Sequence, residues 1–116
     1  YVVDNCEAIL KVLLKGTIGS IYNVGVGVTH SNLDVVDSVC RHVAKFTHMG
    51  YEHLSALKQS VADRPGHDRE YSMDSSKIRN DLGWIPVMSF GEGLGHTVRW
   101  YVEHSEWVEQ RKARST

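Results

Sequence analysis

Three stretches of this sequence repeat apolar residues at helical spacing, and they constrain the fold more than any other feature. Residues 5–15, 34–46 and 90–102 each place apolar side chains three or four positions apart. That period brings the apolar side chains to one face of an α-helix. The sequence therefore predicts three amphipathic helices, each of which must bury its apolar face against another element.

Residues with capping chemistry lie at the ends of these stretches. Ser, Thr, Asp and Asn favour the start of a helix, and glycine commonly follows its end. The residues expected in these roles are Asp4 with Gly16, Ser31 with Asp34, and Ser89 with Glu92. We expect the middle helix to end near Phe46 or His48 and the tail 110–116 to be frayed.

Shorter elements are expected between these helices. Alternation and β-branched residues predict a strand over 21–26, with weaker strand patterns over 59–63 and 70–73. A short helix is expected between Asp74 and Gly83. The predicted fold class is α/β of the α+β kind: a mostly helical small lobe with a few short strands, forming a single partial domain over residues 1–116.

Composition excludes several kinds of partner. Lys and Arg number 13 and Asp and Glu 14, so no strong field attracts nucleic acid or an anionic membrane. No apolar run approaches the roughly 20 residues of a membrane span. Cys6 and Cys40 fit reduced thiols in a cytoplasmic protein. The opening YVVDNCEAIL has no initiator methionine, so we expect it to continue a longer protein.

The sequence holds no complete active site. It has no C-x-x-C or H-E-x-x-H metal motif, no G-x-S-x-G nucleophile elbow and no Tyr-x-x-x-Lys pair. Gly25 and Gly27 suggest a phosphate-binding loop, but His30 replaces the third glycine, and a flexible turn is the better interpretation. We therefore expect no catalytic residue, no cofactor and no metal in this chain.

The stretch DRPGHDREY, residues 63–71, gathers binding chemistry in a loop. Arg64 offers a planar set of donors suited to phosphate oxygens, and His67 can donate to an oxygen. Pro65 and Gly66 bend the chain between them, and Asp63 can hold the basic groups in place. From the residues alone, a site for a diphosphate or sugar hydroxyl and a solvated surface loop both remain open.

A resemblance adds to this interpretation. DRPGHDREY, then MDSSKIRNDLGWIP and SFGEGLGHTVRWYVEH, resembles the C-terminal part of the dTDP-glucose 4,6-dehydratase family, within the extended short-chain dehydrogenase/reductase superfamily. YVVDNCEAILKVL, IYNVG and SNLDVV fit the same family in the same order, and the match extends to about Lys112. The family departs from this sequence after IYNVG, where VGVTH replaces a Gly-Gly-Asn type of turn.

The resemblance implies a role for the chain in carbohydrate biosynthesis. Such lyases have an N-terminal Rossmann domain that holds NAD and a C-terminal lobe that binds a dTDP-sugar. NAD oxidises C4 of the sugar, water leaves across C5–C6, and hydride returns to C6. This chain resembles the substrate lobe without its Rossmann domain. The substrate-binding residues implied by the resemblance are Asn32, Asp63, Arg64, Pro65, Gly66 and His67.

Two alternatives stay open. One is the corresponding lobe of a sibling nucleotide-sugar dehydratase or epimerase, with a different base or sugar. The other is a stand-alone, non-catalytic binding module. In that case the apolar positions Val35, Val39, Leu94 and Val98 are expected to pack against a second copy, so we expect the isolated chain to self-associate.

Overall fold

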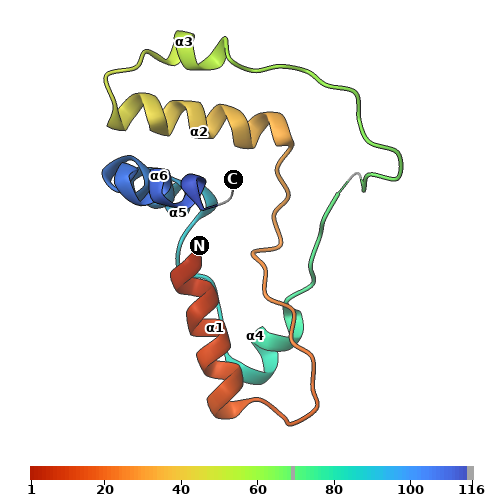
Figure 1. Cartoon of the computed structure of the whole chain (residues 1–116). Helices are drawn as coiled ribbons and strands as arrows, with labels where there is room; N and C mark the ends of the chain where they lie inside the picture. The colour runs from red at the N-terminus through yellow and green to blue at the C-terminus, as the bar shows by residue number, and fades with distance from the viewer. Residues whose placement is uncertain (69, 115–116) are drawn as a thin grey trace. The chain divides into compact units, whose positions relative to one another are not determined.

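The computed structural model describes residues 1–68 and 70–114 (Figure 1). Its helices are α1 (Val2–Lys15), α2 (Asn32–Phe46), α3 (Tyr51–Ser55), α4 (Ser76–Leu82), α5 (Phe90–Glu103) and α6 (Ser105–Ala113). The chain folds into two compact units. The first contains Tyr1–His30 and Ala62–Ser89, and the second contains Ser31–Val61 and the chain from Phe90 onward. The single partial domain expected from the sequence stays a prediction.

The expected α/β class is wrong, because the described residues form helices and no strands. The stretches 21–26, 59–63 and 70–73 run without regular structure. A strand requires a neighbouring strand to complete its hydrogen bonds. In the first of these stretches, side chains take two backbone acceptors instead: Lys77 Nζ donates to the carbonyl of Ile21 at 3.1 Å, and Ser75 Oγ donates to that of Gly25 at 2.8 Å.

The core of the first unit joins α1 to α4 and the residues after it. Ala8, Ile78 and Trp84 are buried, and Val12, Tyr22, Val24 and Leu82 pack around them. Trp84 Nε1 donates to the carbonyl of Asp4 at 3.0 Å. Gly83 ends α4 in the left-handed region, with φ of 60°, as the sequence predicts. These contacts fix the start of α1 against the segment that follows α4.

Asp4 has a different role from the predicted one. α1 begins at Val2, so Asp4 lies in its first turn and does not cap the helix. Its buried carboxylate accepts hydrogen bonds from the backbone amides of Val87 at 2.9 Å and Met88 at 3.3 Å. Asp4 therefore accepts hydrogen bonds from backbone amides in a distant part of the chain. The residues around it in the sequence do not indicate this role.

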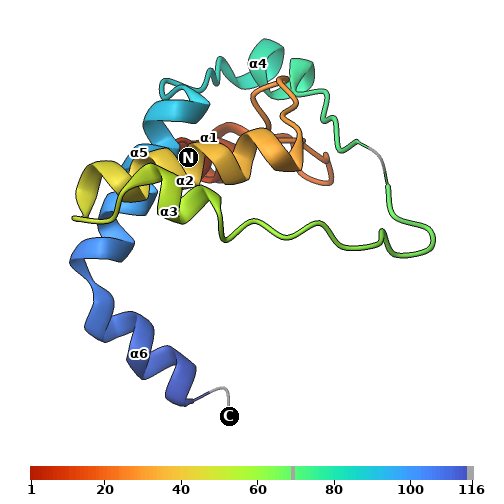
Figure 2. The ribbon, with the colours of Figure 1, turned by 90° about the horizontal axis from the view of Figure 1, so that it is seen from above.

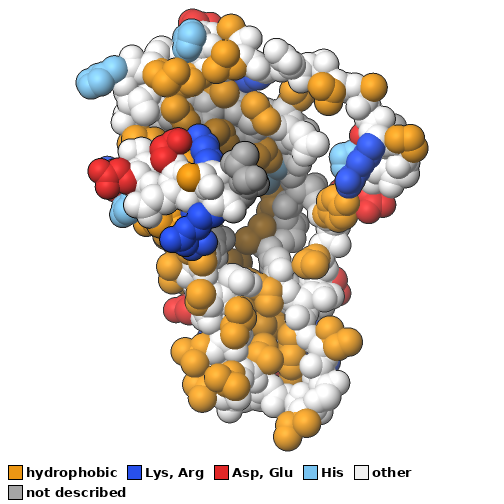
Figure 3. All heavy atoms as spheres, viewed as in Figure 1, with side chains coloured by type: hydrophobic (Ala, Val, Ile, Leu, Met, Phe, Trp, Pro, Cys, Tyr) orange, Lys and Arg blue, Asp and Glu red, His pale blue; other side chains and the backbone are white. Residues whose placement is uncertain are grey.

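The face of α1 opposite the core is apolar and exposed. Ala8 and Val12 pack on the core, but Ile9 and Leu13, expected on the same buried stripe, are exposed. The exposed aliphatic side chains of this helix are Val2, Val3, Ile9, Leu10, Leu13 and Leu14. Figure 3 shows hydrophobic side chains gathered over the part of the molecule that contains α1. A helix that is apolar on both faces is typical of one covered on both.

The second unit is built on the packing of α2 against α5, with α3 on α2. The predicted capping box of Ser31 and Asp34 is confirmed: Ser31 Oγ accepts from the amide of Asp34 at 3.1 Å, and the Ser31 amide donates to Asp34 Oδ2 at 3.3 Å. α2 ends at Phe46, also as predicted. Leu54 and Val98 are the buried hydrophobic residues of this unit.

The last helical stretch divides into two helices. α5 ends at Glu103 and α6 begins at Ser105, and the chain changes direction between them (Figure 2). The tail that the sequence predicts to be frayed is helical through Ala113, and its residues 115–116 lie outside the described part. Within that part, no helix combines the length and apolar character needed to span a bilayer. Cys6 and Cys40 are both free thiols.

Candidate functional site

A β-turn brings together the charged residues of the 63–68 loop. The amide of His67 donates to the carbonyl of Arg64 at 3.2 Å, which closes a four-residue turn. Pro65 and Gly66 occupy the two central positions, and Gly66 has φ of 74°. This is the arrangement that a type II turn requires, because its third residue needs positive φ. The sequence prediction of a loop bent at Pro65-Gly66 is confirmed.

The Asp63 carboxylate organises this turn. Its Oδ1 lies 2.6 Å from Nδ1 of His67 and accepts from the Arg64 amide at 2.9 Å. The hydrogen bond with His67 is the main cause that lowers the pKa of Asp63 below its ordinary value. Because Oδ1 is an acceptor, Nδ1 of His67 carries the hydrogen, and Nε2 is the ring atom left for other partners.

The Arg64 side chain is exposed and makes no ion pair in the described part of the chain. Its backbone is fixed at both ends of the turn, through its amide and its carbonyl. The backbone of Arg64 is thus fixed, while its guanidinium retains its fork of N–H donors for an external anion.

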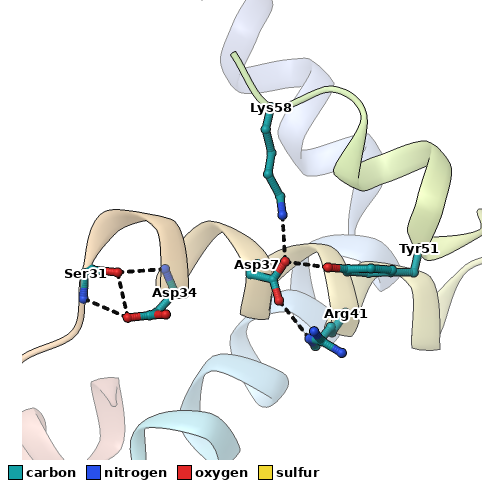
Figure 4. A network of polar contacts seen from close by, with 6 residues as sticks. All are labelled: Ser31, Asp34, Asp37, Arg41, Tyr51 and Lys58. Atoms are coloured by element: carbon teal, nitrogen blue, oxygen red, sulfur yellow. Dashed lines mark hydrogen bonds and ion pairs between the residues drawn. The ribbon is translucent and has the colours of Figure 1, made fainter. Parts of the chain in front are cut away.

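Asn32 lies in the other unit, as the first residue of α2. It is exposed and follows Ser31, whose side chain caps the helix (Figure 4). The expected position of Asn32 at a helix start is therefore confirmed. Of the predicted site residues, the structure brings Asp63, Arg64, Pro65, Gly66 and His67 together in one turn, and Asn32 belongs to a separate element.

A hollow of about 230 Å³ lies between two extended segments of the first unit, 25–29 and 71–73. Residues 69 and 70 separate the second segment from the 63–68 loop in the sequence. A Cβ atom built on Gly25 would lie 3.2 Å from Cβ of Met73, so glycine permits this close approach. Gly27 has φ of 72° and bends the first segment. The sequence indicates a flexible turn here, but it does not indicate the second wall.

Sequence reasoning also missed a polar network in the second unit. The Asp37 carboxylate accepts from Lys58 Nζ at 2.6 Å, Tyr51 Oη at 2.5 Å and Arg41 Nε at 2.9 Å (Figure 4). Tyr51 and Lys58 lie 14 and 21 residues after Asp37, so no helical spacing reveals these two contacts. The hydrogen bond from Lys58 is the first cause that holds the pKa of Asp37 well below its usual range.

The described residues contain no group of three or more His, Cys, Asp or Glu residues placed to hold a metal ion. The candidate site is therefore the turn at 63–67. It presents a guanidinium and an imidazole, which are groups that suit recognition of an anion.

Comparisons with known proteins identify the family. The model of the GDP-mannose 4,6 dehydratase family matches residues 1–97. The chain belongs to this family. A dTDP-glucose 4,6-dehydratase from Xanthomonas campestris pv. campestris is 40% identical over 112 residues, and one from Escherichia coli is 40% identical over 113. These alignments cover 94% and 95% of this chain and 31% of each relative.

A solved structure of the same kind agrees with this assignment. The crystal structure of dTDP-glucose 4,6-dehydratase from Bacillus anthracis, in complex with NAD, aligns with a TM-score of 0.74 and 35% identity. It covers 91% of this chain and 31% of that protein. The chain thus spans about a third of the length of the dehydratases it matches, and it corresponds to their C-terminal part. The predicted family resemblance is confirmed.

Proposed function

We propose that this chain is the nucleotide-sugar-binding part of a dTDP-glucose 4,6-dehydratase, and that the turn at 63–67 holds the substrate diphosphate. The observation that carries the proposal is the Arg64 side chain, exposed and without an ion pair in the described residues, on a turn fixed by Asp63. The relatives that carry the dTDP-glucose name support the nucleotide.

Each predicted residue has a defined task in this proposal. Arg64 binds phosphate oxygens, His67 donates or accepts at Nε2, and Asp63 orients both. Pro65 and Gly66 set the turn. Asn32 belongs to the other unit, and its proposed role is separate: its amide contacts substrate at the start of α2, where backbone N–H groups and the helix dipole favour anions.

NAD supplies the redox chemistry in the complete enzyme, and none of it falls to the residues of this chain. Their contribution is orientation of the substrate, which can lower a reaction barrier by several kcal/mol. The exposed aliphatic face of α1 supports a second part of the proposal: this face packs against the NAD-binding domain of the complete enzyme.

Titration of the chain with dTDP, GDP and UDP tests the assignment. We expect dTDP to bind at least about tenfold more tightly than the other two, which is a difference of about 1.4 kcal/mol. Preference for GDP would instead favour a sibling enzyme, which the GDP-mannose name of the matching family model supports. Absence of binding by all three at millimolar concentration would contradict the proposal and favour a stand-alone module.

The Arg64→Ala variant tests the site. We expect it to weaken dTDP binding by about tenfold to a hundredfold, because a charge-assisted hydrogen bond is lost. Lys15→Ala removes an exposed charge from α1 as a matched control and should leave affinity unchanged. Equal affinity of Arg64→Ala and the parent chain would remove the role proposed for this residue.

A further inference from the structure

A groove of about 390 Å³ runs between α2 and α5 in the second unit, apart from the residues of the proposed substrate site. Basic side chains from both helices line it, together with one aromatic ring and one carboxylate. The lining residues are His42, Lys45, Phe46, Gly91, Glu92, Gly95, His96 and Arg99.

Two glycines shape this groove. A Cβ atom built on Gly95 would lie 2.9 Å from Cε1 of His42, so the absence of a side chain allows α5 to approach the imidazole. A Cβ atom on Gly91 would meet nothing within 4 Å, which leaves that part of the groove open. The opening is therefore a consequence of residue choice on α5, since larger side chains at either position would fill it.

One permanent cation from each helix lies beside the Phe46 ring, Lys45 from α2 and Arg99 from α5. Lys45 Nζ is 5.7 Å and Arg99 Cζ is 5.2 Å from the ring centroid. In the described residues no carboxylate oxygen lies within 4.0 Å of Lys45 Nζ. Arg99 faces Glu103 at 3.6 Å in an exposed pair, and such pairs contribute little, so this contact does not commit the guanidinium.

We propose that this groove binds a small phosphate-bearing anion at a second site, independent of the proposed substrate turn. Arg99 presents a planar fork of donors, Lys45 a compact charge, and His42 a ring N–H donor. The two positive charges of Arg99 and Lys45 exceed the single negative charge of Glu92, which also lines the groove. Phosphate matches this set better than a neutral sugar, because two charged donors line one concave surface.

Inorganic pyrophosphate and dTMP are the probes, since the anion could be inorganic or a phosphate ester. Both are titrated into the Arg64→Ala variant in a calorimeter. In this variant the proposed substrate turn has lost its guanidinium. We expect pyrophosphate to bind this background, and amide NMR shifts of Gly91 and Gly95 to move on binding. Binding of dTMP with the same shift pattern would assign the site to phosphate esters as well.

Charge reversal locates the site. Lys45→Glu in the Arg64→Ala background should weaken pyrophosphate binding at least about tenfold. Gly91→Glu should do the same, and it protects folding because a carboxylate in the first turn of α5 favours the helix. Lys112→Gln on α6 is the matched control and should leave binding unchanged. Retention of full affinity in both charge variants, or no binding in the Arg64→Ala chain, would overturn the proposal.

Discussion

Nδ1 of His67 lies 2.6 Å from Oδ1 of Asp63, across a turn that also places the Arg64 amide on the same oxygen. One carboxylate thus fixes both basic residues of the candidate site. If these contacts are removed, Arg64 and His67 remain in the sequence but lose their common anchor. Asp63 is therefore a positioning residue. Its loss should first weaken the hydrogen bond of the Arg64 amide in the turn.

We therefore expect Asp63→Ala to speed hydrogen exchange of the Arg64 amide by several-fold, because its acceptor is gone. In the parent chain, acidification should lower the protection factor of this amide, which is the ratio of its intrinsic exchange rate at the same pH to the observed rate. The pKa of Asp63 is lowered, so its contacts are complete above the ordinary aspartate value and are lost as the pH falls below about 4. Asp68→Ala, in the same loop, is the control. Unchanged exchange in Asp63→Ala would show that the turn holds without the carboxylate.

The Asp37 network makes a prediction about acid stability. Lys58, Tyr51 and Arg41 all donate to this carboxylate, and its pKa is well below the usual range. A depressed folded-state pKa gives stability that is present above the unfolded value and disappears as the pH falls towards the folded one. Thermal melts followed by circular dichroism should show Asp37→Ala melting lower than the parent at pH 7, with the difference shrinking at pH 3.

Arg41→Ala is the matched comparison for this network. Its i,i+4 contact with Asp37 is exposed on the arginine side, so its loss should lower the melting temperature less than loss of Asp37, which all three donors share. An Asp37→Ala midpoint equal to that of the parent at pH 7 would contradict the stabilising role of the network.

Local chemistry predicted the parts of the fold that depend on neighbours in sequence. The capping box of Ser31 with Asp34, the left-handed stop at Gly83 and the turn at Pro65-Gly66 are satisfied within a few residues. Such features depend on backbone geometry and nearby side chains, which the sequence states directly.

Features that depend on distant partners were not predictable. The alternation in 21–26 favours a strand, but no described segment pairs with it, and Lys77 and Ser75 take its carbonyls. Helical periodicity placed Ile9 with Ala8 on one stripe, although α1 is apolar on two faces and only packing decides which is covered. The candidate turn was found because its residues are adjacent, whereas the hollow between 25–29 and 71–73 joins residues about 45 positions apart.

Asp4 should be important for the stability of the first unit. Its carboxylate accepts from the Val87 and Met88 amides in a buried setting. Asp4→Ala leaves those donors without this acceptor, which should cost about 1–3 kcal/mol in unfolding free energy by urea denaturation. Glu7→Ala, an exposed change on the same helix, is the control and should alter stability by less than about 0.5 kcal/mol. Equal effects of the two changes would exclude a special role for Asp4.

Gly95 offers a test in which helix propensity and packing predict opposite results. The sequence alone assigns this glycine a cost of about 1 kcal/mol against alanine within a helix, so alanine should stabilise. In the structure a Cβ there would lie 2.9 Å from Cε1 and 3.2 Å from Nδ1 of His42, so the imidazole, which stacks on Phe46, would have to shift. We expect Gly95→Ala to lower the unfolding free energy by about 1–3 kcal/mol, as overpacking does. Gly91→Ala, where a Cβ meets nothing within 4 Å, should raise it by about 0.5–1 kcal/mol.

Adding His42→Ala to Gly95→Ala should recover part of the loss if the imidazole is the obstacle. Stabilisation by Gly95→Ala equal to that by Gly91→Ala would show that α2 and α5 do not depend on this close approach.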